Sequence, residues 1–82
     1  MTIEELRNAR AANPFRPFTI RLADGRSFLV PHRDYLSMSP VGGRTVIVYG
    51  TNQGAFSILD LLLVTELSFE EQAVPGGSNG AQ

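Results

Sequence analysis

Residues 15–40 read FRPFTIRLADGRSFLVPHRDYLSMSP. Two runs of alternating apolar and polar side chains flank the pair Asp24-Gly25 in this stretch. Alternation with a period of two is typical of half-buried strands, and Asp-Gly between two such runs is a strong turn signal. We therefore predict a β-hairpin centred on Asp24 and Gly25.

The length of the loop sets which residues of this hairpin face one another. A three-residue loop, residues 23–25, brings apolar side chains of both strands together on one face. The pairs are then Phe18 with Val30, Ile20 with Phe28, and Leu22 with Arg26. A two-residue loop would instead set Phe28 against Arg21. We predict the three-residue loop, in which Gly25 occupies the position that needs a positive φ.

The segment before the hairpin predicts a short helix. Thr2 and Glu5 have the spacing of a capping box, in which hydroxyl and carboxylate each accept from the other's backbone amide. Ile3 and Leu6 fall on one face of this helix. The helix should end at Asn13-Pro14, because a residue before proline avoids the α region.

The rest of the chain predicts further strands. Residues 31–40 suit a wrapped turn with one or two short strand pairings, because apolar side chains lie there between two prolines. A second hairpin is predicted from the strand at residues 45–49 and its return strand at residues 55–59, in which Phe56 and Ile58 share a face. Residues 58–69, ILDLLLVTELSF, fit a helix that begins at Asp60 or a strand. We favour a one-turn break at residues 60–62 followed by a strand.

This order of elements predicts a mainly β fold, a small five-stranded antiparallel barrel with a short N-terminal helix. It resembles SH3-like and Sm-like barrels through LADGRSFLV (residues 22–30) and ILDLLLVTEL (residues 58–67), over roughly residues 2–69. The RNA-binding motifs of the Sm-like family are not present, since residues 35–37 lack the expected Asn and residues 58–60 replace the basic-histidine motif. The patterns FRPF, LADGR and VPH resemble short uncharacterised bacterial proteins, a resemblance that implies no activity.

The chain has 82 residues, which predicts a single domain over residues 1–72. The remaining residues 73–82, AVPGGSNGAQ, are rich in Gly, Ser and Asn and are predicted to form a disordered tail. A core of this size supplies only about 3–5 kcal/mol of stability. We therefore expect the domain to bury further apolar surface against another chain.

Composition excludes several classes of site. Cysteine is absent, so no disulfide, catalytic thiolate or Cys-based metal site can form. His32 is the only histidine, and we expect no metal and no cofactor. Glu4, Glu5 and Arg7 interrupt the N-terminal segment where a signal peptide needs apolar residues, and no stretch approaches the ~18 apolar residues of a membrane span. We expect a cytoplasmic protein.

Charge is unevenly distributed along the chain. All seven basic residues are arginines within residues 1–44, which carry four acidic residues and a net charge of +3, whereas residues 45–82 carry four acidic residues and no base, a net charge of −4. The pI of about 5.7 argues against a general nucleic-acid-binding protein. Arginines interleaved with aromatic residues are nevertheless the nearest pattern to an RNA-binding surface. The candidates are Arg16, Arg21, Arg26, Arg33 and Arg44.

The remaining polar residues have simple structural interpretations. His32 with Asp34 could act as a general base, but no nucleophile accompanies them, and a turn residue that bonds to backbone explains His32 better. Asp24-Gly25 and Gly42-Gly43-Arg44 lack the spacing of a phosphate-binding loop. Asp60 is interpreted as a turn cap.

These patterns predict a non-enzymatic interaction module that self-associates through its Leu-rich closing strand. The predicted interface residues are Leu61, Leu63, Val64, Leu67 and Phe69. The alternative is an Sm-like RNA-binding ring that uses the five arginines. A hydrolytic enzyme is disfavoured, because no residue pairs a nucleophile with a base.

Overall fold

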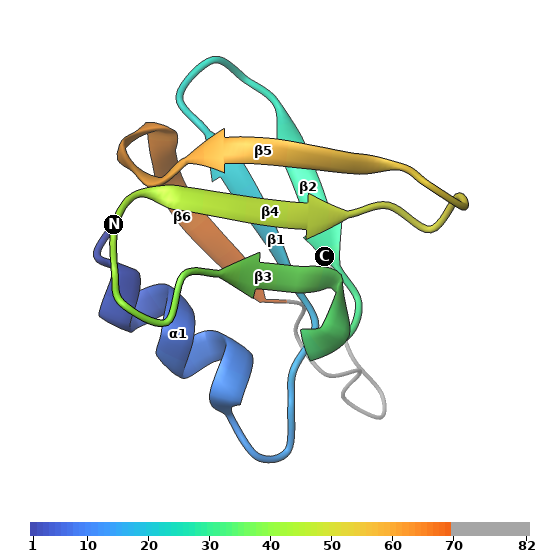
Figure 1. Cartoon of the computed structure of the whole chain (residues 1–82), viewed down its shortest axis with the longest axis horizontal. Helices are drawn as coiled ribbons and strands as arrows, with labels where there is room; N and C mark the ends of the chain where they lie inside the picture. Colours follow the sequence, from blue (N-terminus) through green and yellow to red (C-terminus); the bar gives the residue numbers. More distant parts are fainter. Residues whose placement is uncertain (70–82) are drawn as a thin grey trace, which may run out of the picture.

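The computed structural model describes residues 1–69, which form one α-helix and six β-strands in two antiparallel sheets (Figure 1). The first sheet has the order β2-β1-β6 and the second the order β3-β4-β5. The strands are β1 (Phe18–Leu22), β2 (Ser27–Val30), β3 (Leu36–Met38), β4 (Thr45–Tyr49), β5 (Phe56–Asp60) and β6 (Val64–Phe69).

The first hairpin has the predicted register. Ile20 lies opposite Phe28, and Phe18 lies opposite Val30. The amide of Leu22 donates to the carbonyl oxygen of Arg26 at 2.9 Å, which closes the three-residue loop. Gly25 has φ +94°, the left-handed conformation that the loop was predicted to require there.

The core lies between the two sheets and includes one residue of the helix. Side chains at most 1% exposed come from both sheets and from α1 (Ile3–Ala11). They are Leu6, Phe18, Ile20, Val30, Leu36 and Val46. In the hairpin, Phe18, Ile20 and Val30 lie on the face that the sequence pattern assigned to the core.

Helix α1 begins at the predicted cap and lies beside β3. The capping box is formed, with the amide of Glu5 donating to Oγ1 of Thr2 and the amide of Thr2 donating to Oε1 of Glu5. Two arginines of the helix reach the neighbouring strand. Nε of Arg10 donates to the carbonyl oxygen of Leu36 at 2.8 Å, and Arg7 donates to that of Ser39 at 3.2 Å.

The predicted five-stranded barrel is wrong in both number and closure. Six strands form two separate sheets within residues 1–69, and the additional strand is β3, which pairs with β4. The chain leaves the first sheet at Pro31, which has no amide to donate, and passes through a 3₁₀ turn at Arg33–Tyr35 before β3 begins. This turn redirects the chain from one sheet into the other.

The ambiguous late segment forms a turn and then a strand, as favoured above. A 3₁₀ turn at Leu61–Leu63 is capped by Asp60, whose Oδ1 accepts from the amide of Leu62 at 2.9 Å. Strand β6 then pairs with β1, which places Leu67 opposite Ile20. Residues 70–82, and with them the predicted disordered tail, lie outside the described residues.

Candidate functional site

The predicted interface residues of the closing segment are divided between the core and the surface. Leu61 and Val64 are each only 4% exposed and pack within the same chain, so their side chains are not available to a partner. The 3₁₀ turn directs Leu61 inward, and Val64 lies opposite Leu22 of β1. Leu63 and Phe69 are exposed, and Leu67 is half-buried against the core.

Three of the five candidate RNA-binding arginines form ion pairs. Arg21 contacts Glu66 at 3.5 Å, Arg26 contacts Asp24 at 2.9 Å, and Arg44 contacts Asp60 at 3.3 Å. The first and third of these pairs join the basic part of the sequence to the acidic part. The charge separation seen along the chain is therefore partly cancelled at the surface.

The other two candidate arginines lie against aromatic rings. Arg33 donates to the carbonyl oxygen of Ala12 at 3.0 Å and lies 5.6 Å from the ring centre of Phe15. Arg16 lies 5.1 Å from the ring centre of Phe69. A phosphate group would have to compete with these contacts.

His32 serves the local backbone, as its simpler interpretation predicted. Its Nδ1 accepts from the amide of Asp34 at 3.3 Å and caps the 3₁₀ turn that follows β2. Asp24 likewise serves the hairpin loop. The amide of Arg26 donates to Oδ1 of Asp24, and this hydrogen bond, with the Arg26 side chain, lowers the pKa of the Asp24 carboxyl.

The four sheet edges differ in how they are protected against pairing with another chain. Edge strand β3 has the α1 arginines bonded to its carbonyl at Leu36 and to that of Ser39, just beyond it. Edge strand β6 carries the charged Glu66. Charged side chains and coverage by other elements are the usual devices that keep an edge from pairing. Strands β2 and β5 contain neither lysine nor arginine, and only β5 ends in a charge, at Asp60.

Strand β5 presents unpaired backbone groups at its outer edge. The amide of Gly50 donates to the carbonyl oxygen of Ala55, and the amide of Leu61 donates to that of Arg44. Hydrogen-bonded and non-hydrogen-bonded residue pairs alternate along an antiparallel ladder. These two bonds therefore determine which residues of β5 direct their backbone groups toward β4. The backbone groups of Ser57 and Leu59 therefore face β4, whereas those of Phe56 and Ile58 face away from it.

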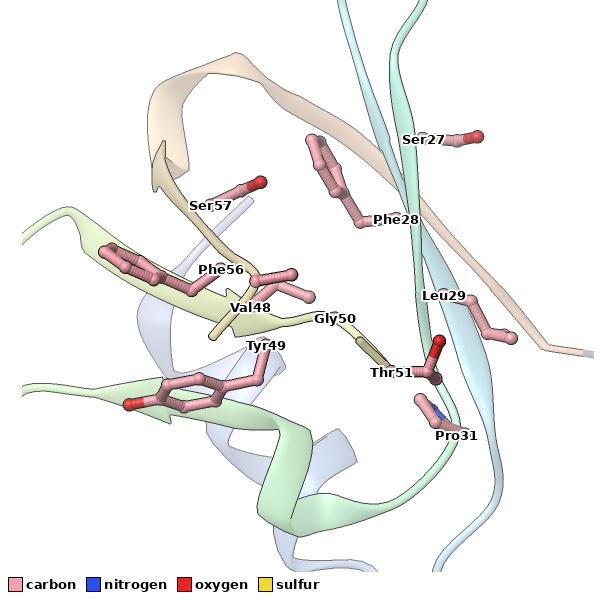
Figure 2. Close-up of a pocket in the computed structure, with 11 residues that line it drawn as sticks. Ser27, Phe28, Leu29, Pro31, Val48, Tyr49, Gly50, Thr51, Phe56 and Ser57 are labelled. Carbon is pink, nitrogen blue, oxygen red and sulfur yellow. The ribbon is translucent and has the colours of Figure 1, made fainter. Parts of the chain in front are cut away.

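The same two residues also expose apolar side chains. Phe56 is 58% exposed and Ile58 is 64% exposed. They lie opposite Tyr49 and Ile47 on the outer face of the second sheet. Figure 2 shows the rings of Tyr49 and Phe56 projecting to the same side of the hairpin. The outer face of β4 and β5 therefore carries an apolar cluster next to an open strand edge.

A groove of about 350 Å³ lies between β2 and the β4–β5 hairpin (Figure 2). Strand β2 contributes Ser27, Phe28 and Leu29 to its wall, and the hairpin contributes Val48, Tyr49 and Phe56 among others. All of the described residues that line it are uncharged.

Comparison of the chain with protein-family models, curated proteins and solved structures finds no match. The candidate sites therefore depend on the geometry of the chain itself. Within residues 1–69 no three His, Cys, Asp or Glu side chains lie close enough to hold a metal ion. No helix in this part of the chain is long and apolar enough to cross a membrane.

The sequence pattern puts Phe56 and Ile58 on one face of β5 but does not mark that face as the surface. The strand FSILD has apolar side chains on both faces. Phe56 and Ile58 lie on the exposed face, and Leu59 lies on the opposite face and is buried. Its sequence therefore contains no signal that distinguishes the core face from the outer face.

Proposed function

We propose that this protein is a non-enzymatic interaction module that self-associates, and that the open edge of β5 forms the contact between two copies. The observation that carries the proposal is the combination, at Phe56 and Ile58, of edge-directed backbone groups with exposed apolar side chains. We place the contact at β5 and not at the closing strand, because Leu61 and Val64 of the closing segment are buried in the core.

Pairing of β5 with β5 of a second copy would provide hydrogen-bond partners for the edge-directed backbone groups and would cover the exposed apolar side chains. In an antiparallel arrangement with two-fold symmetry, Ile58 faces Ile58 of the second copy, and each donates to and accepts from the other. Phe56 then faces Asp60 of the second copy. The two three-stranded sheets join into one continuous sheet, and the isoleucine side chains bury part of their exposed surface.

Strand β5 has few of the features that prevent such pairing. It contains no proline and no basic residue, and its only charged side chain, Asp60, is paired with Arg44 at 3.3 Å. A contact through one strand of five residues is smaller than the ~1,600 Å² of a standard interface. We therefore expect a reversible dimer whose population rises with concentration.

Two finer expectations from the sequence remain predictions. One is the kinship of the two sheets with SH3-like or Sm-like barrels, and the other is the cytoplasmic location. The alternative of an RNA-binding ring gains no specific support, because three of its five arginines are held in ion pairs.

Sedimentation velocity over a concentration series tests the self-association. Ile58→Lys places a charge at the centre of the proposed contact and should leave the protein monomeric. Leu62→Lys is the matched control, because Leu62 is 66% exposed but lies in the 3₁₀ turn outside β5. Leu63→Glu tests the closing segment and should leave the dimer intact. A protein that is monomeric at every concentration, or a dimer that only Leu63→Glu dissociates, contradicts the proposal.

A further inference from the structure

We propose that the groove between β2 and the β4–β5 hairpin binds an extended, uncharged apolar segment of another protein, which adds to β2 as a further strand. The inference concerns a second surface of the molecule and does not depend on the self-association through β5. The edge of β2, the groove beside it and the charge of the surrounding residues supply three separate observations.

The first observation is that the outer edge of β2 offers unpaired backbone groups. The hydrogen bond from the amide of Leu22 to the carbonyl oxygen of Arg26 determines which residue pairs of the β1–β2 ladder are hydrogen-bonded. Phe28 and Val30 consequently direct their backbone groups toward β1. Ser27 and Leu29 direct theirs toward the open edge, where an extended chain could pair with them.

The second observation is that the groove lies directly beside this edge. Ser27 and Leu29 are themselves part of its wall, and Val48 and Ser57 of the hairpin lie on the opposite side (Figure 2). Side chains of an added strand alternate between the two faces of the sheet. Those on the inner face would enter the groove beside Phe28. The groove would then make binding selective for the side chains of the added strand.

The third observation is the charge of the surroundings, which determines the chemistry of the occupant. The described residues that line the groove are uncharged, and Arg26 next to β2 is already paired with Asp24 at 2.9 Å. A charged side chain in the groove would lose hydration without gaining a partner. The side chain of Phe28, on the groove side of β2, offers apolar contact instead (Figure 2). The groove therefore selects a segment with apolar side chains at alternate positions.

Strand β2 also limits the length of the bound segment. Pro31 follows directly after β2 and cannot donate to a neighbouring strand. Only Ser27 and Leu29 remain as edge-directed residues, so pairing extends over about four or five residues of the partner. A contact this short predicts weak binding that depends on the side chain in the groove.

Fluorescence anisotropy with labelled synthetic peptides tests the proposal on the full chain. The probe is a capped peptide of about nine residues, within the usual length of a strand, in which valine, leucine and valine alternate with serine and threonine. A second peptide carries aspartate in place of the central leucine. A third keeps the leucine but is N-methylated at alternate amides, so that it cannot pair along a strand edge.

We expect the leucine peptide to bind at least about tenfold more tightly than either comparison peptide, since an unpaired charge or a lost ladder each removes a main contact. Phe28→Lys places a charge on the groove side of β2 and should weaken its binding at least about fivefold, with circular dichroism confirming that the variant is folded. Leu62→Lys, an exposed position outside the groove lining, should change it less than about twofold.

Three outcomes overturn the proposal. The first is no binding of the leucine peptide at about 1 mM, beyond the weakest affinity of a specific site. The second is equal binding of all three peptides. The third is a loss of dimer when Phe28→Lys is examined by sedimentation, which would mean that a second copy of this chain covers the groove. Failure of the β5 contact alone, seen with Ile58→Lys, leaves peptide binding unchanged and is distinguished in this way.

Discussion

Nε of Arg10 donates a hydrogen bond of 2.8 Å to the carbonyl oxygen of Leu36, and so joins helix α1 to the first residue of β3. With Arg7, which donates to the carbonyl oxygen of Ser39, this contact occupies one carbonyl group in an edge strand of the second sheet and one just beyond it. The opposite edge of the same sheet is β5, where Phe56 and Ile58 are exposed. The two edges of one small sheet thus differ in protection, since helix α1 covers the β3 edge and leaves the β5 edge open.

Removing the Arg10 guanidinium should destabilise the fold. We expect Arg10→Ala to lower the free energy of unfolding by about 1–2 kcal/mol, because a part-buried bond from a charged donor is lost. Urea denaturation measures the change. Asn8→Ala, an exposed position of the same helix, is the control and should change the free energy by less than about 0.5 kcal/mol. Equal effects at both positions would mean that helix propensity, not the bond to β3, is responsible.

Leu6 attaches the helix to the core. Its side chain is fully buried, so Leu6→Ala should cost about 2–5 kcal/mol and unfold a large fraction of this small domain. Thermal denaturation followed by circular dichroism measures the effect. Leu62→Ala removes the same atoms from an exposed position and should leave the melting temperature nearly unchanged. A stable Leu6→Ala variant would contradict the packing described above.

Gly25 should resist replacement because of its backbone conformation. Its φ of +94° is unfavourable for residues with a Cβ, although no atom lies within 4 Å of the position that a Cβ would take. We expect Gly25→Ala to lower the free energy of unfolding by about 1–2 kcal/mol. Gly25→Asn should cost less, since asparagine tolerates a positive φ better. Urea denaturation distinguishes the two variants, and a stabilising alanine would contradict the loop conformation.

The capping box makes stability depend on pH. Hydrogen bonds from the Thr2 backbone amide and side chain lower the pKa of Glu5 below its ordinary value. The stabilisation is therefore complete above the ordinary glutamate pKa, and it is lost as the pH falls toward the lower pKa of the folded chain. Glu5→Gln should reduce the decline of stability over this acidic interval.

The control for this measurement is Glu4→Gln. Glu4 lies on the same helical turn, but its carboxylate does not belong to the capping box. Asp24 also has a lowered pKa, and it contributes equally to both variants, so that their difference isolates Glu5. Urea denaturation at several acidic pH values provides the comparison. Identical pH profiles for the two variants would rule out a contribution from the capping box.

Several elements could be predicted from the sequence because their signals are local. Thr2 and Glu5 are three residues apart and form the cap directly. Asp24-Gly25 determines the loop, and the loop determines that Ile20 faces Phe28. Asp60 caps the turn that separates β5 from β6. Each of these contacts joins residues close in sequence, so that composition and spacing suffice to find it.

The candidate contacts could not be predicted in the same way. The leucine-rich closing segment suggested surplus apolar surface, but Leu61 and Val64 fill the core. The five-stranded barrel was also wrong, because the pairing of β3 with β4 depends on where the chain turns after Pro31. Both outcomes depend on which faces of two sheets meet, and no short stretch of sequence contains that information.

By itself, the sequence determined the helix cap, the register of the first hairpin and the turn at Asp60, since each follows from neighbouring residues. Only the tertiary structure decided that Leu59 is buried while Ile58 and Phe56 remain exposed beside an open edge. The physical reason is that both faces of β5 carry apolar side chains. Packing of the second sheet against the first covers one face and leaves the other exposed to solvent.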